Sequence, residues 1–190
     1  GEHLIRQGDS FRPITADDIV ILLRSPGSTG GEFRYALESA GIACTMGTDT
    51  DILHAPEVET LRAILQIVHN PLQDIPLIAV LTSPVFSFTA DDLAKIRGKD
   101  HYISFYKALE KYPTEKVTSF LSLLTELRYD ARFLTVTQLV HQIFLRTGML
   151  SIYGAMDDGE ESVRNLQNFC QIAADYESTG RKDLSYFLEH

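Results

Sequence analysis

The amino-acid sequence predicts a mainly α protein with a small α/β part at its N-terminal end. Two observations lead to this fold class. Between residues 18 and 46, a continuous aliphatic run, a helical pattern and a second apolar run follow one another, which is the order strand, helix, strand. Beyond His54, every segment spaces its apolar residues as a helix does. A lone βαβ unit leaves the faces of its sheet uncovered, so we expect it to be an incomplete part of a larger α/β domain.

The first strand of this unit is predicted at Asp18–Arg24, because its apolar residues are continuous rather than alternating, as in strands covered on both faces. The residues before it, Gly1–Ala16, are mixed in character. Within them, Leu4 and Ile5 suggest the tail of a helix, followed by a loop through Pro13. This opening segment indicates little about function.

The rest of the βαβ unit follows directly. The Gly-rich segment Ser25–Gly31 breaks the strand, and Glu32–Ala40 has the apolar spacing of a helix. Gly41 stands where glycine commonly ends a helix. The shorter apolar run Ile42–Met46 predicts the second strand.

The remainder of the chain predicts a series of helices. Thr89 with Asp92, and Thr135 with Gln138, have the spacing of capping boxes, which start helices by satisfying free backbone N–H groups. The predicted helices are Glu57–Val68, Ile75–Leu81, the segment after Thr89, Val117–Leu127, the segment after Thr135, Val163–Ala173 and Asp183–Leu188. About 135 residues of helix are enough to form a core of their own.

Composition and charge limit the possible functions. Apolar residues make up 44% of the 190 residues and charged residues 23%, as in ordinary globular proteins. The net charge of -9 argues against a surface that binds nucleic acid all over, so any DNA contact must be local. The longest apolar run, Ile19–Leu23, is too short to span a bilayer, and we expect a cytoplasmic protein without a membrane partner.

Catalytic and metal-binding motifs are not recognisable in the sequence. The six histidines form no HExxH motif, and Cys44 and Cys170 match neither a zinc pattern nor a CxxC motif, so we expect two buried thiols and no metal site. His54 and Glu57 lie three residues apart and form a possible pair, although this spacing near a helix start is more often a solvated turn. We therefore expect no catalytic residue and no bound cofactor in this segment.

The Gly-rich segment Ser25–Gly31 is a candidate anion site. It joins a predicted strand to a helix start, where free N–H groups and the helix dipole favour a phosphate, and Arg24 lies at the carboxyl end of that strand. The segment is not a P-loop, because Glu32 follows Gly31 where that motif requires a lysine. A plain flexible turn remains the alternative.

Aromatic residues are frequent in the helical part. With interleaved Arg or Lys they could stack single-stranded bases, but most fall on apolar stripes, so we predict core packing. They are Tyr102, Phe105, Tyr106, Tyr112, Tyr129, Phe133, Phe144, Tyr153, Phe169 and Tyr176.

An ordered series of short segments carries a family resemblance. The segments are Asp18–Ser25, Ala40–Ile42, Glu57–Val58, Asn70–Leu77, Val80–Pro84, Arg164–Leu166, Tyr176–Ser178 and Asp183–Leu188. Together they resemble the AddA (also called RexA) subunit of the bacterial helicase-nuclease, a UvrD-like superfamily 1 helicase. The resemblance implies that residues 1–55 are the first part of the RecA-like motor domain 2A, and that residues 56–190 are its helical 2B insertion.

The same resemblance implies a function for the parent protein. Such a protein uses ATP and Mg to unwind double-strand DNA breaks and degrade them for recombinational repair, together with an AddB/RexB-type nuclease subunit. This chain has no Walker A, Walker B or nuclease motif, so the resemblance implies a non-catalytic segment of an ATP-dependent DNA helicase and exonuclease.

Site residues follow from the resemblance at two places. Arg24 and Ser25 match the Arg-Ser that follows the first 2A strand, where single-stranded DNA runs, and are expected to contact the DNA backbone. UvrD-like 2B domains hold duplex DNA with a Gly-Ile-Gly turn, and the matching place here is Val85–Thr89. Without those glycines, close approach to a phosphate is harder.

Two other function classes remain open from the residues alone. One is a helical protein–protein interaction module without a DNA role, in which Ser25–Gly31 is only a linker. The other is a nucleotide-binding enzyme built on the βαβ unit, with its ligand at Gly27–Gly31.

Overall fold

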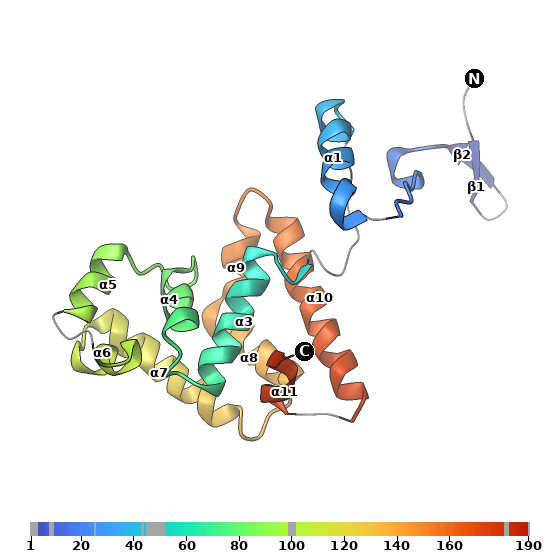
Figure 1. The fold of residues 1–190 in the computed structure, drawn as a ribbon. Coiled ribbons are helices and arrows are strands. Elements are labelled where there is room, and N and C mark those ends of the chain that lie inside the picture. The colour runs from blue at the N-terminus through green and yellow to red at the C-terminus, as the bar shows by residue number, and fades with distance from the viewer. Residues whose placement is uncertain are drawn as a thin grey trace. The chain divides into compact units, whose positions relative to one another are not determined.

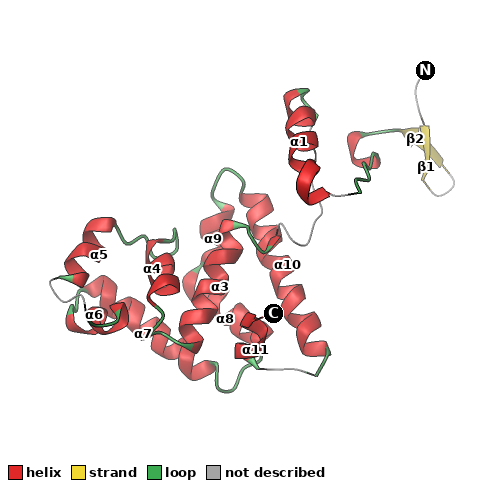
Figure 2. Cartoon of the chain, viewed as in Figure 1, coloured by secondary structure: helices red, strands yellow, loops and turns green. Residues whose placement is uncertain are grey.

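The computed structural model describes residues 4–7, 10–24, 26–42, 44, 52–98, 102–180 and 183–189. The chain divides into two compact units, Gly1–Asp51 and Ile52–His190. The sequence predicts a division after residue 55. Figure 1 follows the chain through both units, and Figure 2 shows that helix predominates, with one small sheet. The mainly α fold class is confirmed, whereas the sheet is not the predicted one.

The sheet of the first unit is an antiparallel hairpin. Strand β1 (Leu4–Gln7) pairs with β2 (Ser10–Pro13), with Leu4 opposite Pro13 and Gln7 opposite Ser10. The prediction of a helix tail and loop over these residues is therefore wrong. The overlooked signal is the Gly-Asp dipeptide at positions 8 and 9, which is typical of a two-residue hairpin connection.

A short turn replaces the start of the predicted strand Asp18–Arg24. Residues Ala16–Asp18 form the 3-10 helix η1, and the carboxylate of Asp18 accepts hydrogen bonds from the backbone N–H and hydroxyl of Thr15, both at 2.9 Å. Arg12 donates to both oxygens of the same carboxylate, at 2.5 and 2.6 Å. The hydrogen bonds from Arg12 and Thr15 hold the pKa of Asp18 well below its usual range.

Residues 19–24 after this turn are not in a strand, which contradicts the prediction. A strand needs neighbours for its N–H and C=O groups. Within the described part of the chain, the sheet consists of β1 and β2 alone, which pair with each other. Of the second predicted strand, Ile42 and Cys44 are not in a strand either, and the rest of that run lies outside the described residues.

Helix α1 (Pro26–Ser39) begins six residues before the predicted start at Glu32. Proline is favoured at the first position of a helix because its φ is already helical and because a backbone N–H at that position would have no acceptor within the helix. The segment Gly27–Gly31 is therefore helical rather than a loop. Gly41, with a φ of 77°, follows the helix as predicted.

The second unit is built from helices around α3, as Figure 1 shows. Helix α3 packs against α4, α7, α10 and α11. The helices are α3 (Pro56–His69), α4 (Asp74–Thr82), α5 (Ala90–Arg97), α6 (Phe105–Lys111), α7 (Glu115–Asp130), α8 (Val136–Thr147), α9 (Met149–Gly154), α10 (Gly159–Ser178) and α11 (Leu184–Glu189). The predicted helices are all present, and the sequence analysis missed only α6 and α9.

Both predicted capping boxes are formed. Thr89 accepts a hydrogen bond from the N–H of Asp92 (3.1 Å), and the Asp92 carboxylate accepts one from the N–H of Thr89 (2.9 Å). Thr135 and Gln138 make the same pair of contacts at the start of α8. These local contacts are readable from sequence because each partner lies three residues from the other.

The core of the second unit is built on α3, most of whose apolar side chains are buried. Its buried side chains include Val58, Leu61, Leu65 and Val68. A buried polar contact joins this helix to α10, where the side-chain amide of Asn165 donates to the carboxylate of Glu57 at 2.8 Å. Glu57 is only 4% exposed, so this contact lies at the edge of the core.

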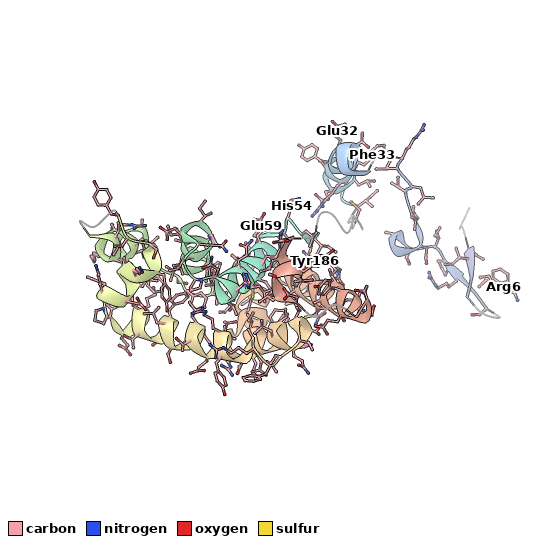
Figure 3. The ribbon with its side chains drawn as sticks, turned by 60° about the horizontal axis from the view of Figure 1, so that its bottom comes forward. Arg6, Glu32, Phe33, His54, Glu59 and Tyr186 are labelled. Carbon is pink, nitrogen blue, oxygen red and sulfur yellow. The ribbon has the colours of Figure 1, made fainter. Side chains whose placement is uncertain are left out.

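The possible pair of His54 and Glu57 is not formed. His54 instead lies 3.9 Å from the carboxylate of Glu59, and both of these side chains are exposed, as Figure 3 shows. The carboxylate of Glu57 is hydrogen-bonded to Asn165 in the interior. Of the two acidic residues in the first turn of α3, it is therefore Glu59 that lies near His54.

Candidate nucleic-acid interface

Arg24 lies in a bend directly ahead of α1, and its side chain is exposed. Only position 25 separates it from Pro26, the first residue of the helix. Ser25, the second residue expected to contact DNA, lies outside the described residues. The structure therefore places Arg24 next to a helix start.

The N-terminal end of α1 is suited to an anion. The N–H groups in the first turn of an α-helix have no acceptor within the helix, and the helix dipole adds positive potential there. No acidic residue lies in this turn to compete with a bound anion. Glu32 and Phe33, labelled in Figure 3, belong to the second turn.

ATP does not fit this segment. A triphosphate is held by a loop whose N–H groups wrap around it and by a lysine, as in a P-loop. Here Gly27–Gly31 are helical, so most of their N–H groups point along the helix axis, and Glu32 follows them. The arrangement can serve one phosphate group but not a nucleotide triphosphate.

The apolar run before Arg24 is open to solvent. Ile19, Val20, Ile21 and Leu22 are exposed by 61%, 76%, 49% and 90%, respectively. A buried Val, Leu or Ile side chain contributes roughly 1.5–3 kcal/mol relative to an exposed one, so up to roughly 6–12 kcal/mol of hydrophobic stabilisation is unused in this run. A segment of this composition is expected to be covered by other structure.

The turn at Val85–Thr89 is shaped by a residue with positive φ. Ser87 has a φ of 53°, a left-handed conformation that non-glycine residues rarely adopt. Its N–H donates to the carbonyl of Ser83 at 2.7 Å, and its hydroxyl donates to the carbonyl of Pro84 at 2.9 Å. These contacts hold in place a backbone shape that glycine adopts more easily.

Lys116 of α7 covers this turn. Its Nζ donates to the carbonyl of Ser87 at 2.7 Å and lies 4.4 Å from the ring centre of Phe88. It also lies 3.8 Å from the carboxylate of Asp92. Lys116 was not predicted from the sequence, because no local pattern relates it to Ser87, which lies 29 residues earlier in the chain.

The predicted burial of the aromatic residues is right for some and wrong for others. Phe105, Phe144, Tyr153 and Phe169 are buried in the core. Exposed instead are Tyr102, Tyr112, Tyr129 and Phe133. Tyr129 is 61% and Phe133 72% exposed, and their ring centres lie 5.4 Å apart.

A pocket of about 490 Å³ adjoins Tyr129 on the second unit. Its lining includes His69, Arg128 and Arg132. The sequence brings Arg128, Tyr129, Arg132 and Phe133 close together at the end of α7, but no local pattern relates them to His69 or Asp183 in the other walls.

Cys44 and Cys170 are both half-buried, and burial raises the pKa of the Cys170 thiol to about 11. In the described ranges, His, Cys, Asp and Glu side chains do not gather in groups of three or more that could hold a metal ion. Of the helices in these ranges, none combines the length and apolar character needed to cross a bilayer.

A family of known proteins matches nearly the whole chain. The family described as the UvrD-like helicase C-terminal domain matches residues 9–190. This match includes the hairpin strand β2, Arg24, α1 and all of the helical unit.

Curated relatives match over a similar range. The A subunit of the ATP-dependent helicase/nuclease of Ruminiclostridium cellulolyticum is 34% identical over 184 residues, which are 94% of this chain and 15% of the relative. The proteins of the same name from Acetivibrio thermocellus and Alkaliphilus oremlandii are 34% and 32% identical, and each match covers 95% of this chain. The chain thus spans about 15% of the length of the relatives it matches.

Proposed function

Because the chain belongs to the family of UvrD-like helicase C-terminal domains, we propose that it is a non-catalytic, DNA-guiding segment of an ATP-dependent helicase-nuclease. The parent protein would unwind double-strand DNA breaks and degrade them for recombinational repair. In this proposal, the segment guides DNA and relays the motion of the motor domains.

The observation that carries this proposal is the exposed run Ile19–Leu22. In an extended chain, four neighbouring apolar side chains would point alternately to both sides, so this run suits a strand covered on both faces. Helix α1, which follows, also leaves Phe33 and Tyr35 exposed. Both features support the interpretation that these residues supply a strand and a helix to a RecA-like 2A domain. The other strands of that domain would lie elsewhere in the parent protein.

Arg24 and Ser25 would contact the DNA backbone at the end of that strand. Support comes from the exposed guanidinium of Arg24 and from the adjacent start of α1, which favours negative charge. The helical unit, residues 56–190, would then be the 2B insertion.

Other parts of the parent protein would supply the chemistry. ATP and Mg would bind motor motifs outside this segment, and an AddB/RexB-type subunit would be the protein partner. The relatives' name, which describes the A subunit of an ATP-dependent helicase/nuclease, supports these assignments. We further propose that the parent protein works in the cytoplasm, where the bacterial chromosome lies.

The test is Arg24→Ala in the full-length helicase-nuclease. Loss of one phosphate contact should lower the affinity for single-stranded DNA equally for all sequences. It should also reduce the slope of log K against log salt concentration by about 0.7 to 1. Fluorescence anisotropy at several salt concentrations measures both quantities.

Arg34→Ala is the matched control, because Arg34 belongs to the same unit and pairs with Glu38 at 2.8 Å within α1. It removes the same charge away from the helix start and should leave the salt slope unchanged. Equal slopes for Arg24→Ala and the unaltered protein would reject the DNA contact and favour a helical protein–protein interaction module.

A further inference from the structure

The pocket of about 490 Å³ on the helical unit lies where three helices approach one another. Val68 and His69 end α3, Arg128 and Tyr129 come from the last turn of α7, and Asp183 directly precedes α11. Its volume is within the range of pockets that bind small molecules or parts of larger ligands. All of its lining residues belong to the second unit.

Arg128 is held in a defined position at this pocket. Its Nε donates to the carbonyl of Val68 at 3.2 Å, near the C-terminal end of α3. This bond uses one side of the guanidinium and leaves the two Nη groups for another acceptor. An arginine positioned in this way loses little conformational entropy when it binds an oxyanion.

The balance of charge around the pocket favours an anion. The pocket is lined by two guanidinium groups, those of Arg128 and Arg132, and by one carboxylate, that of Asp183. That carboxylate accepts hydrogen bonds from the hydroxyl of Ser185 (2.5 Å) and from the backbone N–H groups of Tyr186 (3.2 Å) and Ser185 (2.8 Å), and these bonds lower its pKa. The negative charge of Asp183 is therefore already stabilised by hydrogen bonds from the first residues of α11.

The nearest acidic residues of α7 are engaged elsewhere. Glu126 and Asp130 accept hydrogen bonds from Arg146 of α8, at 2.9 and 2.6 Å. Their repulsion of an anion in the pocket is thus reduced. In a chain with a net charge of -9, this pocket is a local site of positive charge.

An exposed aromatic surface adjoins the two arginines. Tyr129 lines the pocket, and its ring contacts that of Phe133, one residue beyond Arg132. Exposed aromatic rings next to cationic side chains are the usual components of sites for single-stranded nucleic acid, in which bases stack and phosphates pair with Arg or Lys.

We propose that this pocket binds a segment of single-stranded DNA, with a phosphate between Arg128 and Arg132 and a base against Tyr129 and Phe133. The inference rests on the proposed function and extends it, because it gives the helical unit a strand-binding site of its own. A peptide of Asp and Glu alone would also pair with the arginines, but its side chains have no flat ring that could stack on the two exposed aromatic side chains.

The first part of the test uses the 190-residue chain and fluorescein-labelled oligo-dT in anisotropy titrations. Arg132→Gln, at an exposed position, should weaken binding by about tenfold, the effect of one charge-assisted hydrogen bond. The salt slope should fall by about 0.7 for the lost phosphate contact. Arg128→Gln should act similarly, but it also removes the bond to Val68, so Arg132→Gln is the decisive variant.

The second part tests base stacking. Tyr129→Leu should weaken binding of oligo-dT by roughly fivefold or more, and it should leave binding of an abasic oligonucleotide of equal length unchanged. Lys107→Gln, an exposed charge change on α6, is the control and should have no effect on either oligonucleotide.

Three outcomes would overturn the proposal. The first is the absence of oligo-dT binding by the chain. The second is an affinity and a salt slope for Arg132→Gln that equal those of the unaltered chain. The third is displacement of oligo-dT by a poly-glutamate peptide, together with no effect of Tyr129→Leu on oligo-dT binding. Arg24→Ala in the same titration separates the two proposals. If it weakens binding while Arg132→Gln does not, the proposed function stands and the pocket inference falls.

Discussion

The two units of the chain use similar apolar patterns with opposite results. In the helical unit, Ile52–His190, the apolar stripes meet one another around α3 and are buried. In the first unit, Gly1–Asp51, the run Ile19–Leu22 is as apolar as any of these stripes and is exposed. All the buried hydrophobic side chains in the described part of the chain lie in the helical unit. An apolar pattern shows what a segment requires, but burial depends on whether the covering elements are present.

The largest effect should come from a matched pair of leucine truncations. Leu65→Ala removes a fully buried side chain from α3 and should lower the free energy of unfolding by about 2–5 kcal/mol, because it leaves a cavity. Leu22→Ala removes a side chain that is mostly exposed and should change it by less than about 0.5 kcal/mol. Urea denaturation followed by circular dichroism measures both. Equal losses would show that the first unit has a core of its own.

A second pair of variants compares glycines. A Cβ at Gly159 would lie 2.2 Å from the carbonyl oxygen of Gly154, so Gly159→Ala should destabilise the helical unit by about 3 kcal/mol. A Cβ at Gly31, within α1, meets nothing within 4 Å. Gly31→Ala should therefore stabilise α1 by up to about 1 kcal/mol through helix propensity. Thermal unfolding tests Gly159→Ala, and amide hydrogen exchange in α1 tests Gly31→Ala.

The buried polar contact of the helical unit provides the third test. Asn165→Ala leaves the buried carboxylate of Glu57 without its amide donor and should cost about 1–3 kcal/mol. Gln171→Ala, on the same helix, removes an exposed contact of the same 2.8 Å length to Asp175 and should cost less than about 0.5 kcal/mol. If the two losses are equal in urea denaturation, burial does not determine the strength of these contacts.

The smallest effect concerns pH and the first unit. Because the folded pKa of Asp18 is depressed, its carboxylate stabilises the turn η1 above the unfolded pKa of about 4, and this stabilisation is lost as the pH falls through the folded value. Arg12→Gln removes the largest cause of that depression and should raise the pKa of Asp18. The pKa of Asp92, lowered mainly by the backbone N–H of Thr89, should not change. Carboxyl NMR titration follows both groups, and no rise at Asp18 would contradict the assignment of the shift to Arg12.

The candidate interface could be predicted only in part from the sequence. Arg24 was singled out because it follows an apolar run and precedes a Gly-rich segment, and the structure places it at the start of α1. The pocket beside Arg128 and Arg132 was not predicted. Its walls come from α3, the end of α7 with the turn after it, and the start of α11, and no sequence pattern relates residues 69, 128 and 183 to one another.

The sequence by itself determined the helices from Pro56 onward, with the exception of α6 and α9. Their signals are local, since apolar stripes repeat every three or four residues and the caps Thr89–Asp92 and Thr135–Gln138 act over three. Tertiary structure alone decided that Tyr129 and Phe133 remain exposed, that Glu57 turns inward to Asn165, and that Ile19–Leu22 is not in a strand. Burial and strand pairing need partners distant in sequence, and a local pattern does not specify whether those partners are there.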